Sequence, residues 1–275
     1  MEMTTMLGIL TVVYFSTLLL FCLYRQHLSV KVGNLIFVIL DIIFFFCWNL
    51  AMYPKGKLND GFETLENISP LMFTLIPLTC FMKGKVREYC FAAIAFLNVG
   101  MLVAMYASPE YEYVYVFRRE ADFMYTSEAL CHMLCSLFGA YLVLTNQVKP
   151  NFSNWIKSMI FLYTIITFGV ILNFVFHKGF FGMNPYGDYS IYMIDIFGSF
   201  EATLAAYYIG VLLVLTIGMQ VGALLDKLTS HNLIETLRHH HKRKGEKTSI
   251  MQAETQPAPE KLTELSPENV EKKEE

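Results

Sequence analysis

The stretch FMYTSEALCHMLCSLFGAYLVLT, residues 123–145, is long and apolar enough to cross a bilayer, yet it holds Glu128 and His132 in its interior. A transmembrane helix needs about 20 predominantly apolar residues. Ionisable side chains inside such a helix are energetically costly, so each of them marks a candidate functional site. We therefore take this segment as the starting point for both the fold and the function.

Six further apolar segments surround this one in the chain. They span residues 6–24, 33–53, 67–82, 86–106, 155–177 and 203–226. The 275-residue chain is 55 % hydrophobic, with a mean hydropathy of +0.42, which is too apolar for an ordinary soluble domain. We predict an all-α polytopic membrane protein with seven transmembrane helices in the cell membrane. The third segment holds Pro70 and Pro77 and should be kinked or broken.

Charged residues outside the segments predict the orientation of the chain. Alternate links are basic, and the remaining links hold most of the acidic residues. The basic links contain Arg25, Lys31, Lys83, Lys85, Arg87, Lys149, Lys157 and Lys227. The positive-inside rule then predicts an outside N-terminus and a cytoplasmic C-terminus. The N-terminus lacks the basic start of a signal peptide, so we expect the first segment to be a retained span.

Composition predicts three regions along the chain. Residues 1–226 form the seven-helix domain, 227–244 form a basic juxtamembrane amphipathic segment, and 245–275 form a disordered charged tail. The basic segment, from Lys227 to Lys244, is expected to bind anionic lipids of the inner leaflet. A further short amphipathic helix is expected near 190–200, in an aromatic interfacial loop.

The charge and the cysteines argue against several functional classes. The net charge of −3 gives no basic surface for nucleic acid. All six cysteines lie in apolar segments, so a disulfide framework is not expected. Cys131 and Cys135 are one helical turn apart, which is not the spacing of a zinc or redox pair. We therefore predict no metal and no cofactor, and membrane lipids as the main partners.

Polar residues inside the predicted spans lie mostly in the outer half of the membrane, given about 1.5 Å of rise per helical residue. These residues are Asn49, Thr74, Glu128, His132, Asn173 and His177. Asp41 instead lies near the middle of its span. Glu128 precedes His132 by four residues and therefore shares its helix face.

A hydroxyl or thiol near a histidine, with a carboxylate to orient that histidine, is the arrangement used in nucleophilic acyl chemistry. Thr74 or a cysteine would be the nucleophile, and His132 would be the general base. Glu128 would set the imidazole tautomer. Asn173 or Asn49 would donate to an oxyanion.

Several short motifs of the chain follow one another in the order seen in the YwaF-like integral membrane proteins. The matching residues are Pro70-Leu71-Met72-Phe73-Thr74, His132, Tyr141-Leu142, Lys149-Pro150, Asn173 and Gly182-Met183-Asn184-Pro185-Tyr186. Over roughly residues 33–226 the chain resembles that family. The family typically has Pro-Leu-His-Leu-Cys at the first motif, so Met72 replaces its histidine and Thr74 replaces its cysteine.

The resemblance implies acyl transfer or ester hydrolysis. The family is similar to a eukaryotic transmembrane phospholipid acyltransferase, which in turn resembles the androgen-induced threonine hydrolases of fatty-acid esters. By position, the nucleophile falls on Thr74 and the histidine on His132. We expect Asn49, Asn173, His177 and Asn184 to contact the substrate. A hydroxyl nucleophile needs a stronger base than a thiol does, so a divergent member without catalysis is also consistent with the replacements.

Three other interpretations stay open. Asn, Thr and His side chains often join membrane helices by hydrogen bonds without doing chemistry. Asp41, together with a kinked third span, would suit a transporter pathway. Seven spans with an outside N-terminus also occur in receptors, and an accessory role would rest on that analogy alone.

Overall fold

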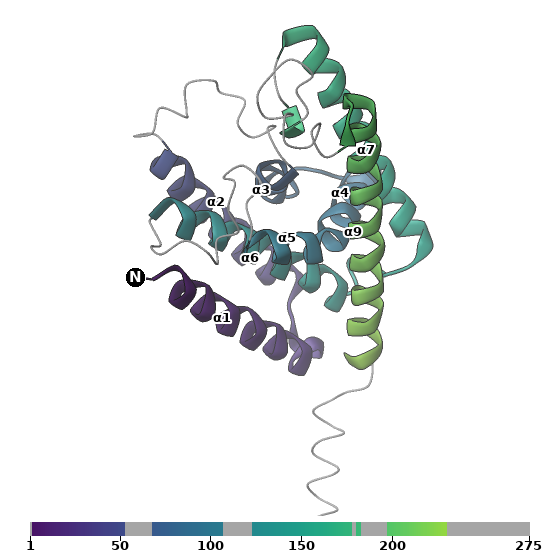
Figure 1. Cartoon of the computed structure of the whole chain (residues 1–275). Helices are drawn as coiled ribbons and strands as arrows, with labels where there is room; N and C mark the ends of the chain where they lie inside the picture. The colour runs from purple at the N-terminus through teal and green to yellow at the C-terminus, as the bar shows by residue number, and fades with distance from the viewer. Residues whose placement is uncertain (1, 53–67, 107–122, 178–179, 183–196, 230–275) are drawn as a thin grey trace, which may run out of the picture. The chain divides into compact units, whose positions relative to one another are not determined.

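The computed structural model describes residues 2–52, 68–106, 123–177, 180–182 and 197–229 (Figure 1). The elements of these ranges are all helical. They are α1 (Met3–Leu23), η1 (Arg25–His27), α2 (Val30–Met52), α3 (Ile68–Leu78), α4 (Gly84–Phe96), α5 (Asn98–Ala104), α6 (Phe123–Leu144), α7 (Phe152–Phe176), η7 (Phe180–Gly182) and α9 (Phe200–Thr229). The predicted regions beyond residue 229, most of the predicted helix near 190–200, and Asn184 lie outside the described residues.

The described helices are those of a helical membrane protein. Five of them, α1, α2, α6, α7 and α9, are long and apolar enough to cross a bilayer, and α4 with α5 makes a sixth if that bent pair is one span. α3 is apolar but has only 11 residues. Pro70 lies in the first turn of α3, where its missing N–H is tolerated, and the helix ends one residue after Pro77.

The fourth predicted span differs from the prediction of one continuous helix over 86–106. It is divided at Leu97 into α4 and α5, whose axes are bent by 49°. The chain has no proline there, and two other helices approach the bend closely. Gly139 of α6 and Gly218 of α9 both lie against it, because an added Cβ would be 2.7 Å from the Ile94 oxygen and 1.9 Å from the Phe96 oxygen, respectively. These two glycines allow the close helix approach that small residues permit in membrane proteins.

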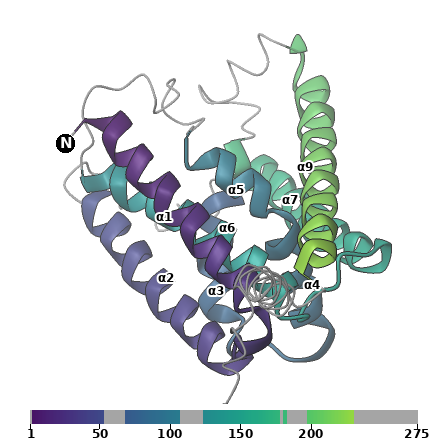
Figure 2. The ribbon, with the colours of Figure 1, turned by 90° about the horizontal axis from the view of Figure 1, so that it is seen from below.

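α6 is the central helix of the described structure. In its most apolar 18-residue window 94 % of the residues are buried, against 17–28 % in α1, α2, α7 and α9. It packs against α1, α2, α3, α4, α5 and α9, and Figures 1 and 2 show α1 and α2 alongside it. The outer helices expose large apolar side chains such as Val12, Phe46 and Ile209, which suit contact with lipid. The polar residues of α6 are therefore enclosed by protein.

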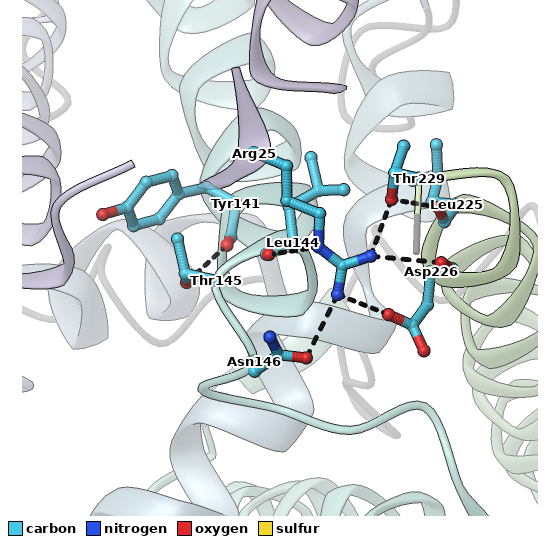
Figure 3. Close-up of polar contacts among 8 residues, drawn as sticks. All are labelled: Arg25, Tyr141, Leu144, Thr145, Asn146, Leu225, Asp226 and Thr229. Atoms are coloured by element: carbon cyan, nitrogen blue, oxygen red, sulfur yellow. Dashed lines mark hydrogen bonds and ion pairs between the residues drawn. The ribbon is translucent and has the colours of Figure 1, made fainter. Parts of the chain in front are cut away.

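Arg25, just after α1, joins the C-terminal ends of α6 and α9 (Figure 3). Its Nε donates to the Leu144 oxygen at 2.9 Å, and one Nη1 bond goes to the Asp226 backbone oxygen at 3.1 Å. Both carbonyls belong to the last four residues of their helices, which have no partner within the helix. The positive guanidinium also complements the negative ends of two helix dipoles. One side chain thus caps two helices that are distant in sequence.

Candidate functional site

Glu128, His132 and Ser136 form a polar stripe on α6. They are spaced four residues apart, so they lie on one face of the helix. All three are buried, and Ser136 has no exposed surface at all. Glu128 and His132 were predicted from the sequence but Ser136 was not, although it has the same four-residue spacing from His132.

The imidazole of His132 has a defined tautomer. Its Nδ1 lies 2.9 Å from the backbone oxygen of Glu128. A carbonyl oxygen only accepts, so Nδ1 carries the proton and Nε2 keeps its lone pair. Glu128 therefore sets the tautomer through its backbone carbonyl, whereas the sequence analysis gave this role to its carboxylate. Chemically, this state of the ring is the one required of a general base at Nε2.

An aromatic cluster of α2 and α3 lies against the histidine. The ring of Phe73 meets that of His132 edge to face, with centroids 5.1 Å apart. Phe73 in turn contacts Phe45 at 6.2 Å and Trp48 at 6.3 Å, both on α2. The resulting wall is apolar, and the residue of α3 whose ring contacts the histidine is Phe73, the neighbour of Thr74.

Thr74 is half-buried, and its hydroxyl is engaged within its own helix. Oγ1 donates to the Pro70 carbonyl oxygen at 3.0 Å. Thr74 and His132, both in the described part of the chain, do not hydrogen-bond to each other. A proton transfer between them requires the Thr74 side chain to leave the Pro70 oxygen by rotating about χ1.

Asp41 is a second buried acidic residue beside α6. It lies on α2, has no exposed surface, and neither of its carboxylate oxygens has a hydrogen-bond partner among the described residues. α2 packs extensively on α6, and Asp41 is within electrostatic range of Cys131 and Cys135. Buried polar groups are normally hydrogen-bonded, so the absence of a hydrogen-bond partner for the Asp41 carboxyl group within the described part of the chain requires an explanation.

The residues expected to contact substrate have other partners in this structure. The Asn49 amide donates to the Phe45 oxygen at 2.7 Å. The Asn173 amide donates to the Phe180 oxygen and accepts from the Phe180 nitrogen, which holds η7 against α7. His177 is exposed at the end of α7, with a left-handed backbone at φ 51°. These residues do not line the surroundings of His132 described above.

A hydrogen-bonded chain that the sequence analysis did not foresee crosses the helix core. Ser136 donates to the Asn98 carbonyl oxygen at 2.7 Å. Because the single hydroxyl proton of Ser136 is donated in this bond, the Tyr14 hydroxyl must be the donor to the Ser136 oxygen, at 3.0 Å. The chain joins α1, α6 and α5. Its members are up to 122 residues apart, and no local sequence pattern reveals such a contact.

A cavity of about 380 Å³ lies among α3, α5 and α9, and most of its lining is apolar. Ser69 and Tyr207 contribute the hydroxyl groups of this lining. Within the described ranges, no group of three His, Cys, Asp or Glu residues is arranged to hold a metal ion. Comparison of the chain with protein-family models, curated proteins and solved structures gives no match.

Proposed function

We propose that this chain is a seven-span, YwaF-like protein of the cell membrane that transfers or hydrolyses acyl esters of membrane lipids. Thr74 is the nucleophile and His132 the general base, in the outer half of the bilayer, with the N-terminus outside. The observation that carries this proposal is the His132 tautomer: Nδ1 is bonded to the Glu128 oxygen, which leaves Nε2 able to accept a proton. Phe73, next to Thr74, is in contact with that ring.

The proposed reaction has two steps. The Thr74 oxygen attacks the ester carbonyl carbon while its proton passes to His132 Nε2. The tetrahedral intermediate collapses, the lipid alcohol leaves with the proton from His132, and the acyl group stays on Thr74. Water, or the hydroxyl of an acceptor lipid, then attacks this acyl ester with His132 again as base, and Thr74 recovers its proton. Glu128 acts as a positioning residue through its backbone oxygen.

The test uses purified protein in lipid nanodiscs with phosphatidylcholine radiolabelled in its sn-2 acyl chain. Thr74→Ala and His132→Ala should each lower acyl release or transfer by at least about 10²-fold, the usual contribution of a positioned general base. Ser127→Ala is the matched control, because its hydroxyl makes the same kind of bond within a helix, to the Phe123 oxygen at 2.7 Å. Full turnover in both Thr74→Ala and His132→Ala refutes the proposal.

A second candidate function, proton-coupled transport, is favoured by one observation. Asp41 is fully buried, and its carboxylate oxygens have no hydrogen-bond partner in the described residues. Intramembrane acidic residues of this kind are typical of proton relays in transporters. Proteoliposomes containing a pH-sensitive dye distinguish the two functions: transport predicts a proton flux that Asp41→Asn abolishes and Thr74→Ala preserves.

The basic segment 227–244 is proposed to bind anionic lipids of the inner leaflet. Clusters of Lys and Arg next to a span gain about 1 kcal/mol per basic residue near an anionic surface. A peptide of this segment should sediment with phosphatidylserine vesicles and be released by high salt. Equal sedimentation with neutral vesicles would contradict this role.

A further inference from the structure

The cavity among α3, α5 and α9 has empty space beside Gly210 of α9. A Cβ added there would meet no atom within 4 Å. Gly100, across the cavity on α5, has a different role, because its Cβ would lie 2.8 Å from the Val214 side chain. Gly100 therefore allows α5 to approach α9, whereas the space beside Gly210 is open. The space is about 380 Å³, near the small end of the roughly 300–1,000 Å³ range of ligand pockets.

The cavity lining has the chemistry of an amphiphile site. It is largely aliphatic and aromatic, and it includes the side chains of Ser69 and Tyr207. Neither hydroxyl makes a hydrogen bond within the described part of the chain, and neither residue is fully exposed. Hydroxyl groups that protein does not satisfy can donate to an ester or carboxyl oxygen, while the rest of the lining suits hydrocarbon.

The cavity lies beside an exposed apolar stripe of α9. Ile209, Leu213 and Ile217 expose about half of their surface along one side of this helix, and Gly210 and Val214, which follow two of them in sequence, line the cavity. An apolar recess next to a lipid-facing helix face suits a hydrocarbon chain that comes from the bilayer. A single chain fits its volume better than a two-chain lipid does.

We infer that this cavity is a binding site for one acyl chain of a membrane lipid, with Ser69 and Tyr207 at the polar part of the site. The site does not depend on the proposed chemistry, since its lining residues include neither Thr74 nor His132. If that chemistry is correct, the bound chain would enter between α3 and α9, beside the helix that carries Thr74.

Photolabelling tests this inference with the full chain in nanodiscs. The probe is phosphatidylcholine with a diazirine at the end of one acyl chain, and the labelled peptides are identified by mass spectrometry. Labelling of α3 and of residues 200–214 should fall by about tenfold in Gly210→Leu, a factor that corresponds to about 1.4 kcal/mol of binding. Gly8→Leu is the matched control, because Gly8 also has open space around it but lies on α1. Its labelling should equal that of the native protein.

Two further variants keep the test decisive. Gly210→Ala adds only one methyl group, so it should reduce labelling partly while preserving the melting temperature, and it replaces Gly210→Leu if the latter unfolds. Thr74→Ala should leave labelling unchanged, which separates this site from the proposed reaction. Unchanged labelling in the folded Gly210 variants, or equal labelling of α1, α2 and α7, would mean surface lipid contact only and overturn the inference.

Discussion

Replacing Arg25 should weaken the described structure more than any other single change to a charged residue. All five of its N–H groups have acceptors. Besides the two helix-end carbonyls, they reach Thr229 Oγ1 at 2.7 Å, Asn146 Oδ1 at 3.1 Å and Asp226 Oδ1 at 2.5 Å. The Arg25 side chain is only 12 % exposed, whereas that of Asp226 is 39 % exposed.

The size of the effect follows from these contacts. A hydrogen bond from a charged donor contributes about 1.5–3 kcal/mol, but bonds from one group are not additive. The ion pair with Asp226 is discounted to about 1 kcal/mol or less because that carboxylate is partly exposed to solvent. The carbonyl groups at the ends of α6 and α9 lose their donors, and only part of that loss is recovered by water. We therefore expect Arg25→Ala to lower the free energy of unfolding by about 2–4 kcal/mol.

The assay is equilibrium unfolding of the purified protein in mixed micelles, followed by tryptophan fluorescence. Arg25→Lys keeps the charge but has three donors instead of five, so it should recover only part of the loss. Lys157→Ala is the control, because it removes an ion pair of 2.8 Å whose Glu88 side chain is 58 % exposed. An Arg25→Ala protein that is as stable as Lys157→Ala would refute the reasoning.

Three further changes test the packing of the core. Gly218→Ala should lower the melting temperature sharply and Gly8→Ala should not, since the new methyl group would lie 1.9 Å from a backbone oxygen only in the first variant. Ser136→Ala should cost about 1–3 kcal/mol in the unfolding assay, because the buried Asn98 carbonyl loses its donor. Asp41→Asn should not destabilise the protein, since it removes a buried carboxylate without partners; a clear loss of stability would reveal an interaction that the described residues do not account for.

The helices could be predicted from sequence because their cause is local. Each described α-helix overlaps a segment predicted from its apolar residues, and α3 ends one residue after Pro77, within the segment 67–82 that was expected to be kinked or broken. The break at Leu97 is not marked by a proline. It lies against glycines of α6 and α9, which are 42 and 121 residues further along the chain. A run of apolar residues indicates that a helix lies in an apolar environment. It does not indicate which neighbouring helix packs closely against it.

The same distinction applies to the candidate site. His132 could be identified because an ionisable residue in an apolar segment is visible without knowledge of its neighbours. Its contact with α3 could not be predicted, because successive residues on a helix point about 100° apart. A small rotation of α3 decides whether Phe73 or Thr74 meets the imidazole, and in this structure it is Phe73. Arg25 was read only as a topology marker, since its acceptors come from segments up to 204 residues away.

The position of α6 explains how the chain carries a carboxyl group and an imidazole inside an apolar helix. α6 is the least apolar of the five long helices and also by far the most buried. The bond between His132 and the Glu128 carbonyl lies within α6 itself, and the surrounding helices keep both side chains out of lipid, where ionisable groups are costly. The same enclosure limits any chemistry at His132, because a lipid substrate must pass between the surrounding helices. α3 has only 11 residues and carries Phe73, whose ring contacts His132, so movement of α3 is the step on which access of an ester to His132 would depend.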